Sequence, residues 1–138
     1  NNHLYPALRR FEEMGAITRE VERRPGKPDR HVYSMTDRGE ELLLGLLHDF
    51  TPEQARDDIE FQVHVAYFHL LEPDAQRAIL AMRAAVLRDW LAHLERALVL
   101  AREHPDTYAY GSRIIAFNQQ RIQHELDWIA QLEQQARA

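Results

Sequence analysis

The 138-residue sequence contains no cysteine, which excludes disulfide bonds, thiolate metal sites and cysteine nucleophiles. It also lacks an apolar run of about 18 residues, the length expected of a membrane-spanning helix. Serine occurs only at Ser34 and Ser112, outside any nucleophile motif, and no glycine-rich phosphate loop is present. We therefore expect neither an enzyme nor a bound cofactor. No secretory signal is visible, so a cytoplasmic location is the default expectation.

The charge is distributed unevenly along the chain. A content of 45% apolar and 28% charged residues is typical of a globular protein, and the net charge is −5. Residues 1–39 hold eight Lys and Arg against six Asp and Glu, whereas residues 40–138 hold nine against sixteen. The basic residues gather most densely at 23–30, and a basic patch of this kind is what phosphate contact requires. A solvated charged loop is the alternative interpretation.

The opening stretch NNHLYPALRRFEEMGAI predicts a short helix. Leu4, Leu8 and Phe11 have helical spacing, and Gly15 suits the position just beyond a helix end, where positive φ costs glycine little. The pattern predicts a helix over residues 3–14. An ordinary amphipathic surface helix with no binding role is one interpretation of this stretch. Since this helix starts almost at the first residue and no initiator methionine is present, we expect further residues upstream.

The next segment predicts a β-hairpin followed by a capped helix. Ile17 and Val21, and then Val32 and Tyr33, indicate two short strands with only partial alternation. Residues 24–30, RPGKPDR, have turn chemistry throughout. The hairpin tip is therefore basic and rigid. Thr36 is a suitable N-cap for a helix running to about His48.

A helix, a glycine stop, a basic-tipped hairpin and a capped helix form the second half of a winged helix–turn–helix module. The stretches LYPALRRFEEMGAI and HVYSMTDRGEELL resemble the PadR family of bacterial transcriptional regulators. The matching positions are Leu4, Tyr5, Pro6, Ala7, Leu8, Arg10, Glu12, Gly15, Ile17, Tyr33, Thr36 and Gly39. Two positions depart from the family pattern: Met35 replaces the usual leucine, and Ser34 stands where a basic residue is common.

The resemblance implies a mainly α fold with two domains. Residues 1–50 would be a winged-helix DNA-binding domain lacking its first helices, since family members carry two further helices before the recognition helix. Residues 51–138 would be an α-helical dimerisation and effector domain. The implied function is a transcriptional repressor that binds a palindromic double-stranded DNA operator as a homodimer. The alternative is a helical dimerisation or ligand-binding protein whose winged module contacts another protein.

The candidate DNA-binding residues are divided between the recognition helix and the wing. They are Asn1, Asn2, His3, Tyr5, Arg9, Arg10, Lys27 and Arg30. The first three occupy the end of the helix that reaches base edges in this motif, and asparagine pairs bidentately with adenine. The resemblance places Tyr5 and Arg10 on the DNA-facing helix, although the ring of Tyr5 has packing as an alternative role.

The segment from about Thr51 predicts three helices, two of them long. The first turns almost continuously apolar after Ile59 and would need cover on most sides. The second has an apolar stripe at Ile79, Met82, Val86, Trp90, Leu94 and Leu98, and the third has one at Ile115, Ile122, Leu126, Ile129 and Leu132. This is more apolar surface than a small bundle covers by itself, which favours a homodimer through these helices.

Five aromatic residues are candidates for an effector pocket between subunits: Trp90, Tyr108, Tyr110, Phe117 and Trp128. The resemblance implies an aromatic or drug-like small molecule as the effector, and packing in the core or dimer interface is the alternative role. The eight histidines form at most helical pairs with carboxylates, as Glu60 does with His64. Tight transition-metal sites need three or four ligands, so we expect no metal.

Overall fold

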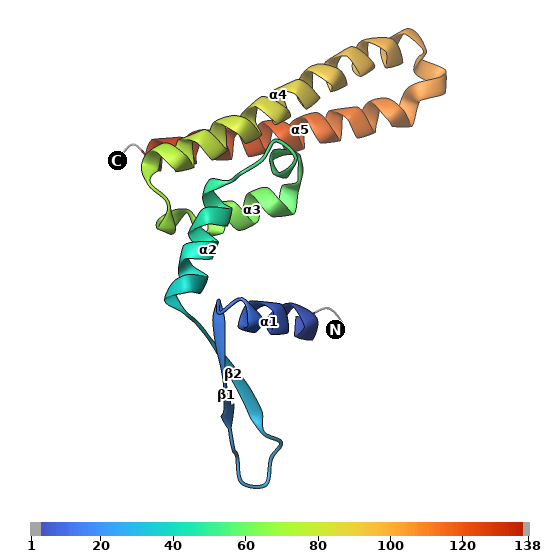
Figure 1. Cartoon of the computed structure of the whole chain (residues 1–138). Helices are drawn as coiled ribbons and strands as arrows, with labels where there is room; N and C mark the ends of the chain where they lie inside the picture. Colours follow the sequence, from blue (N-terminus) through green and yellow to red (C-terminus); the bar gives the residue numbers. More distant parts are fainter. Residues whose placement is uncertain (1–3, 137–138) are drawn as a thin grey trace. The chain divides into compact units, whose positions relative to one another are not determined.

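The computed structural model describes residues 4–136, which divide into two compact units with the boundary along the chain between Asp49 and Phe50 (Figure 1). None of the described helices is long and apolar enough to cross a membrane. The first unit consists of α1 (Leu4–Glu13), β1 (Ile17–Glu22), β2 (Arg30–Met35) and α2 (Asp37–His48). The second consists of α3 (Asp58–Ala66), α4 (Pro73–Glu103) and α5 (Pro105–Ala136), with single 3-10 turns at Gln54–Arg56 and Phe68–Leu70. The predicted mainly α fold with a winged module is confirmed.

Helix α1 ends at the glycine that the sequence indicated. Gly15 has φ of +72°, and its N–H donates to the Glu12 carbonyl at 3.0 Å. The Ala16 N–H donates to the Phe11 carbonyl at 2.8 Å, which completes the paired bonds of a Schellman motif. The chain therefore reverses sharply and enters β1 directly.

The start of α2 is held against this reversal. The Thr36 hydroxyl accepts the Gly39 N–H at 3.1 Å as an N-cap and donates to the Gly15 carbonyl at 2.5 Å, while the Thr36 N–H donates to the Ala16 carbonyl at 3.0 Å. The predicted cap is confirmed. It also fixes where α2 begins relative to the end of α1.

Strands β1 and β2 form a two-stranded antiparallel sheet, with Ile17 opposite Met35 and Glu22 opposite Arg30. Figure 1 shows the hairpin extending away from α1 to a narrow loop. Pro25 and Gly26 form the turn, closed by a bond from the Lys27 N–H to the Arg24 carbonyl at 3.1 Å. Gly26 has φ of +71°, which a turn with proline before glycine requires.

In the second unit, α4 and α5 lie side by side as a long antiparallel pair (Figure 1). A bond from the Arg77 guanidinium to the Ala136 carbonyl at 3.3 Å joins the start of α4 to the end of α5. The predicted stripe on α5 is confirmed as the side that packs, since Ile122 and Ile129 are buried.

The stripe predicted for α4 is only partly correct. Ile79 is buried, but the rest of that stripe is half-buried, and the fully buried row lies one position further along the helix surface: Leu80, Arg83, Ala84 and Leu87. The prediction that the first helix is covered on most sides is wrong for the single chain. Helix α3 ends at Ala66 and buries only Phe61 and His64, leaving Val63 46% and Tyr67 41% exposed.

Candidate nucleic-acid interface

Helix α1 presents its polar side chains to solvent. None of its residues is buried, Tyr5 is 64% exposed, and Arg9 and Arg10 are exposed. Tyr5 precedes the adjacent Arg9 and Arg10 by about one helical turn, and the three residues line a shallow depression of about 430 Å³ together with Pro6 and Glu13. The structure therefore brings three of the predicted DNA-binding residues onto one surface. Asn1, Asn2 and His3 lie outside the described residues.

The wing tip presents the other predicted cations. Lys27 and Arg30 are both exposed, Lys27 at the closing position of the turn and Arg30 at the first position of β2. The Arg24 guanidinium donates to the Pro28 carbonyl at 3.3 Å, across the loop. Arg24 therefore braces the tip, whereas Lys27 projects from it.

One cation of the first unit is paired within the chain. Arg19 on β1 lies 3.5 Å from the Glu12 carboxylate on α1. Because this ion pair is exposed, it contributes at most about 1 kcal/mol of stability. It joins α1 to the hairpin within the first unit.

The aromatic residues predicted as an effector pocket do not meet within one chain. Tyr110 and Phe117 are 78% and 63% exposed, and Tyr108 packs against His104 with ring centroids 6.4 Å apart. Trp90 and Trp128 lie in the half-buried part of the second unit. A pocket between subunits, as the sequence suggested, stays a prediction.

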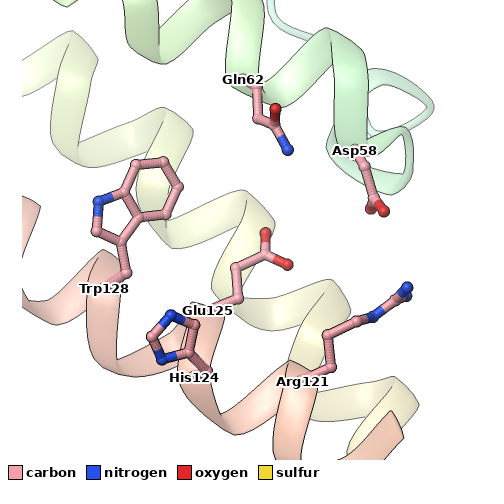
Figure 2. A pocket seen from close by; sticks show the side chains of 6 residues that line it. All are labelled: Asp58, Gln62, Arg121, His124, Glu125 and Trp128. Carbon is pink, nitrogen blue, oxygen red and sulfur yellow. The ribbon is translucent and has the colours of Figure 1, made fainter.

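Trp128 lines a separate pocket of about 260 Å³ between α3 and α5 (Figure 2). Figure 2 shows Asp58 and Gln62 on the α3 side and Arg121, His124, Glu125 and Trp128 along α5. The Trp128 ring also meets Phe61 edge-on, with ring centroids 6.1 Å apart. This end of α5 is thus covered by α3.

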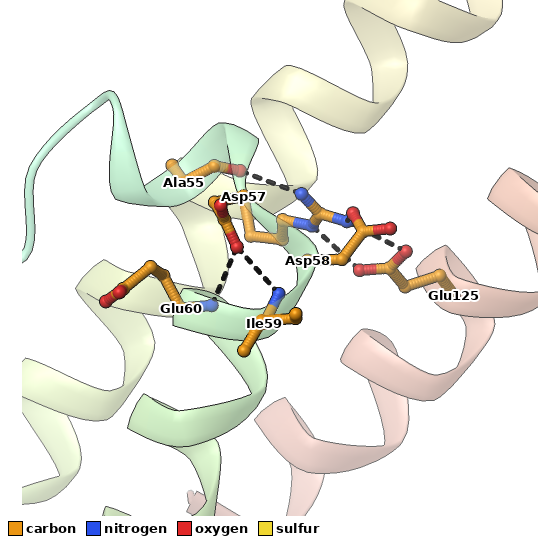
Figure 3. A network of polar contacts seen from close by, with 7 residues as sticks. Ala55, Asp57, Asp58, Ile59, Glu60 and Glu125 are labelled. Atoms are coloured by element: carbon orange, nitrogen blue, oxygen red, sulfur yellow. Dashed lines mark hydrogen bonds and ion pairs between the residues drawn. The ribbon is translucent and has the colours of Figure 1, made fainter. Parts of the chain in front are cut away.

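Sequence reasoning missed the most heavily bonded side chain of the second unit, Arg83, which is 1% exposed. Its guanidinium donates to the Ala55 carbonyl at 3.0 Å, to Asp58 at 2.6 Å and to the two Glu125 carboxylate oxygens at 2.7 and 3.1 Å (Figure 3). It also lies 5.4 Å from the ring centroids of Phe61 and Trp90. The arginine thereby joins three segments of the unit.

The surroundings of Arg83 keep it charged. Burial alone would lower the pKa of Arg83, but the hydrogen bonds and negative charges of Glu125 and Asp58 outweigh burial and raise that pKa above its ordinary value. The available sequence signal was an arginine inside an otherwise apolar helical row with Leu80, Ala84 and Leu87. Asp57 supports the same region, because its carboxylate accepts the first N–H groups of α3 (Figure 3).

Comparison with known proteins gives the following. No curated protein matches the sequence. Bacillus subtilis PadR, solved in complex with operator DNA, is similar in structure with a TM-score of 0.50 at 17% identity, covering 98% of this chain and 78% of that one. The protein smu.1604c from Streptococcus mutans gives a TM-score of 0.48 at 19% identity over 92% of this chain and 74% of that one. The PadR-like regulator BC1756 from Bacillus cereus gives 0.30 at 17% identity over 98% and 75%.

The family comparison agrees with the resemblance of the opening motifs. The matched segment contains α1, both strands of the wing and most of α2, which are the elements that carry the exposed cations. Residues 1–44 of this chain thus match the transcriptional regulator PadR-like family.

Proposed function

We propose that this protein is a DNA-binding transcriptional repressor that binds a palindromic operator as a homodimer and is released by a small aromatic or drug-like effector. The observation that carries the DNA-binding part is that one unit holds both an exposed basic face on α1 and a rigid, basic wing tip. The family match of residues 1–44 supports it, and so does the fold shared with Bacillus subtilis PadR, which was solved with operator DNA.

The residues of α1 and the wing divide between base reading and phosphate contact in this proposal. Helix α1 enters the major groove, and the residues that precede it in the sequence, Asn1, Asn2 and His3, read base edges. The exposed side chains of α1 and the wing contact phosphates: Tyr5, Arg9, Arg10, Lys27 and Arg30. A dimer with two-fold symmetry presents two such surfaces, which is why the operator is palindromic.

The wing is tested by the salt dependence of binding. Lys27→Ala should weaken binding to a random-sequence DNA duplex and lower the slope of log K against log salt by about one, since one phosphate contact is lost. Arg102→Ala, an exposed cation in the last turn of α4, is the matched control and should change neither quantity. Equal effects of the two substitutions would show that the hairpin is not a DNA-contacting wing.

Base reading is tested on an operator selected from a random DNA pool. Asn2→Ala should cost roughly 1–3 kcal/mol on that operator, the worth of one bidentate pair, and almost nothing on random DNA. Arg10→Ala should weaken binding to both DNAs together, because phosphate contacts carry no sequence information. If Asn2→Ala leaves the ratio of the two affinities unchanged, His3 or an upstream residue carries the specificity instead.

The effector pocket is proposed between subunits. Tyr110 and Phe117 are exposed in the single chain and so are available to a partner, together with Trp90, Tyr108 and Trp128. A planar aromatic molecule bound there should quench tryptophan emission and weaken operator binding at the same concentration. Quenching without a change in operator affinity would leave the molecule a ligand but not an effector.

A further inference from the structure

Helix α3 is fixed to α4 by the turns at its two ends. The turn before it contains Ala55, which is 1% exposed and whose carbonyl accepts the Arg83 guanidinium of α4 at 3.0 Å. At the other end, the side-chain amide of Gln76 in α4 donates to the carbonyls of Phe68 and Leu71, both at 2.8 Å. Leu71 is buried as well. The chain on either side of α3 is therefore held in place.

Between these turns the chain is held less firmly. We call residues 57–67 the α3 strap. Phe61 and His64 are its only buried side chains, and Ile59 is 73% exposed. The Phe61 ring meets Trp128 of α5 edge-on. Because α3 has nine residues, a length that is marginal for an isolated helix in water, its stability depends on these contacts.

One of the two buried side chains has an unsatisfied polar atom. The Nδ1 atom of His64 lies 2.8 Å from the Glu60 carbonyl oxygen, which makes Nδ1 the nitrogen that carries the proton. The Nε2 atom is an acceptor, yet it is buried and has no hydrogen-bond partner among the described residues. The Phe50 ring lies against the imidazole, with ring centroids 4.7 Å apart. Burying an unpaired acceptor destabilises the closed strap, and opening would return Nε2 to water.

The main polar contact that holds the strap closed can break without leaving a buried charge unpaired. The carboxylate of Asp58, which is 51% exposed, accepts Arg83 at 2.6 Å (Figure 3). Arg83 also donates to both carboxylate oxygens of Glu125 on α5, at 2.7 and 3.1 Å. If the strap opens, Arg83 keeps Glu125 and Ala55 as partners, while Asp58 gains water. The large penalty of an uncompensated buried arginine is thereby avoided.

The strap is also one wall of the pocket between α3 and α5 (Figure 2). Asp58 and Gln62 belong to this wall, and the side chains opposite them come from α5. Displacement of the strap would therefore widen the pocket and expose the facing rings of Phe61 and Trp128.

We propose that the α3 strap opens by local unfolding between its two fixed turns while α4 and α5 stay folded, that His64 is its weak point, and that the opening lets small molecules reach the space between α3 and α5. The strap lies wholly in the second unit, so its opening is independent of the proposed DNA contact.

Amide hydrogen exchange of the unmodified protein tests local opening. The amides of residues 62–66 should exchange at least about a hundredfold faster than those around Leu87 in α4 or Ile129 in α5, because a small opening costs less than global unfolding. Low concentrations of urea should change the exchange rate of the strap little, since little surface is exposed when it opens. Equal protection of α3, α4 and α5 would overturn the proposal, because the strap would then open only with the whole unit.

Two substitutions with opposite expected effects test the weak point and the closing contact. His64→Leu removes the unpaired Nε2 and should slow exchange in the strap about tenfold, whereas His69→Leu, at an exposed histidine beyond it, should not. Asp58→Ala should speed the exchange about tenfold, and Glu60→Ala, which removes a carboxylate bonded to Gln54 instead of Arg83, should have a much smaller effect. Unchanged exchange in His64→Leu would show that His64 is not the weak point. Equal effects of the two acidic substitutions would overturn the role of Asp58.

Thiol labelling tests whether the opening admits a small molecule, because the protein has no cysteine of its own. His64→Cys and Ala84→Cys each place one thiol at a buried position, the first in the strap and the second in α4. Iodoacetamide should modify the thiol at position 64 in the folded protein much faster than the thiol at position 84. Equally slow modification of both would show that the space under the strap stays closed to small molecules.

Discussion

Gly39 occupies a position where the backbone of another segment leaves no space for a side chain. A Cβ there would lie 2.0 Å from the Ala16 carbonyl oxygen and 2.9 Å from Met35 Cγ. The carbonyl cannot move easily, because it also accepts the Thr36 N–H. The family motif includes this glycine, and the close packing of α2 on the α1–β1 reversal gives a physical reason for it.

We therefore expect Gly39→Ala to lower the free energy of unfolding by about 3 kcal/mol, as overpacking at a rigid site does. Gly45→Ala, in the same helix, is the control, since nothing lies within 4 Å of its added Cβ. Because alanine favours helix over glycine, Gly45→Ala should raise that free energy by about 0.5–1 kcal/mol. Urea denaturation of the two variants measures both values. Destabilisation of the same size in both would contradict the close approach at Gly39.

The second prediction at the residue scale concerns the contribution of Arg83 to stability. Arg83→Met should lower the free energy of unfolding by about 3–5 kcal/mol, because Asp58 and Glu125 lose their buried partner. Since Asp58 is half-exposed, water compensates it in part and the lower end of the range is expected. Arg88→Met, an exposed arginine of the same helix, is the control and should have little effect. Arg83→Lys should not restore stability, because an ammonium cannot reproduce the bonds of the guanidinium fork.

At the scale of elements, α1 is anchored chiefly at its C-terminal end. Its Schellman motif and the ion pair of Glu12 with Arg19 tie it to β1, but none of its residues is buried. Beside it lies an apolar hollow of about 330 Å³. The side chains that line it are Phe11, Met14, Ala16, Ile17, Met35, Gly39, Leu42, Leu43 and Leu46. Helix α1 therefore has little tertiary packing in this chain.

Amide hydrogen exchange should show that α1 opens more easily than the better packed helices. In the chain studied, the amides of α1 should exchange much faster than those around Leu87 in α4 or Ile129 in α5, because local opening of α1 exposes little buried surface. The matched comparison is α2, whose Leu47 is buried and whose first turn is capped. Protection in α1 equal to that in α5 would mean that the hollow is filled in solution.

At the scale of the whole molecule, charge and proposed assembly divide between the two units. The cations that would contact DNA lie in the first unit, where residues 1–49 hold eight Lys and Arg against nine Asp and Glu, whereas residues 50–138 of the second unit hold nine against thirteen. Repulsion of DNA by the acidic part leaves the basic surface of the first unit as the favoured point of contact. In the proposed homodimer, binding to two half-sites would depend on contacts between the second units of the two copies.

Phe117→Glu should therefore separate dimerisation from DNA contact. We expect the variant to sediment as a monomer and to lose at least tenfold in affinity for a full palindrome, because two linked half-sites no longer bind together. Its affinity for a single half-site should be unchanged. Phe117→Leu is the control and should keep both dimer and affinity. A mobility-shift titration measures the affinity of each variant for the full palindrome and for the single half-site. An equal loss of affinity for both DNAs would contradict the assignment of DNA contact to the first unit and dimerisation to the second.

Local chemistry allowed the first unit to be predicted from the sequence. Gly15 adopts the positive φ that its position suggested, Gly26 lies in the turn that residues 24–30 indicated, and Thr36 caps α2 as predicted. These features depend on residues within a few positions of each other, as does the grouping of Tyr5, Arg9 and Arg10 on one helix face. Short-range spacing was therefore sufficient for the fold of this unit and for the described part of its candidate site.

Only the tertiary structure determined which apolar faces of the second unit are covered. Arg83 is buried because Ala55 and Glu125, 28 and 42 residues away along the chain, supply its partners. The sequence pattern of α3 likewise predicted cover on most sides, yet Val63 and Tyr67 are exposed. Helical periodicity identifies a stripe but not its partner, because the partner depends on how separate helices pack.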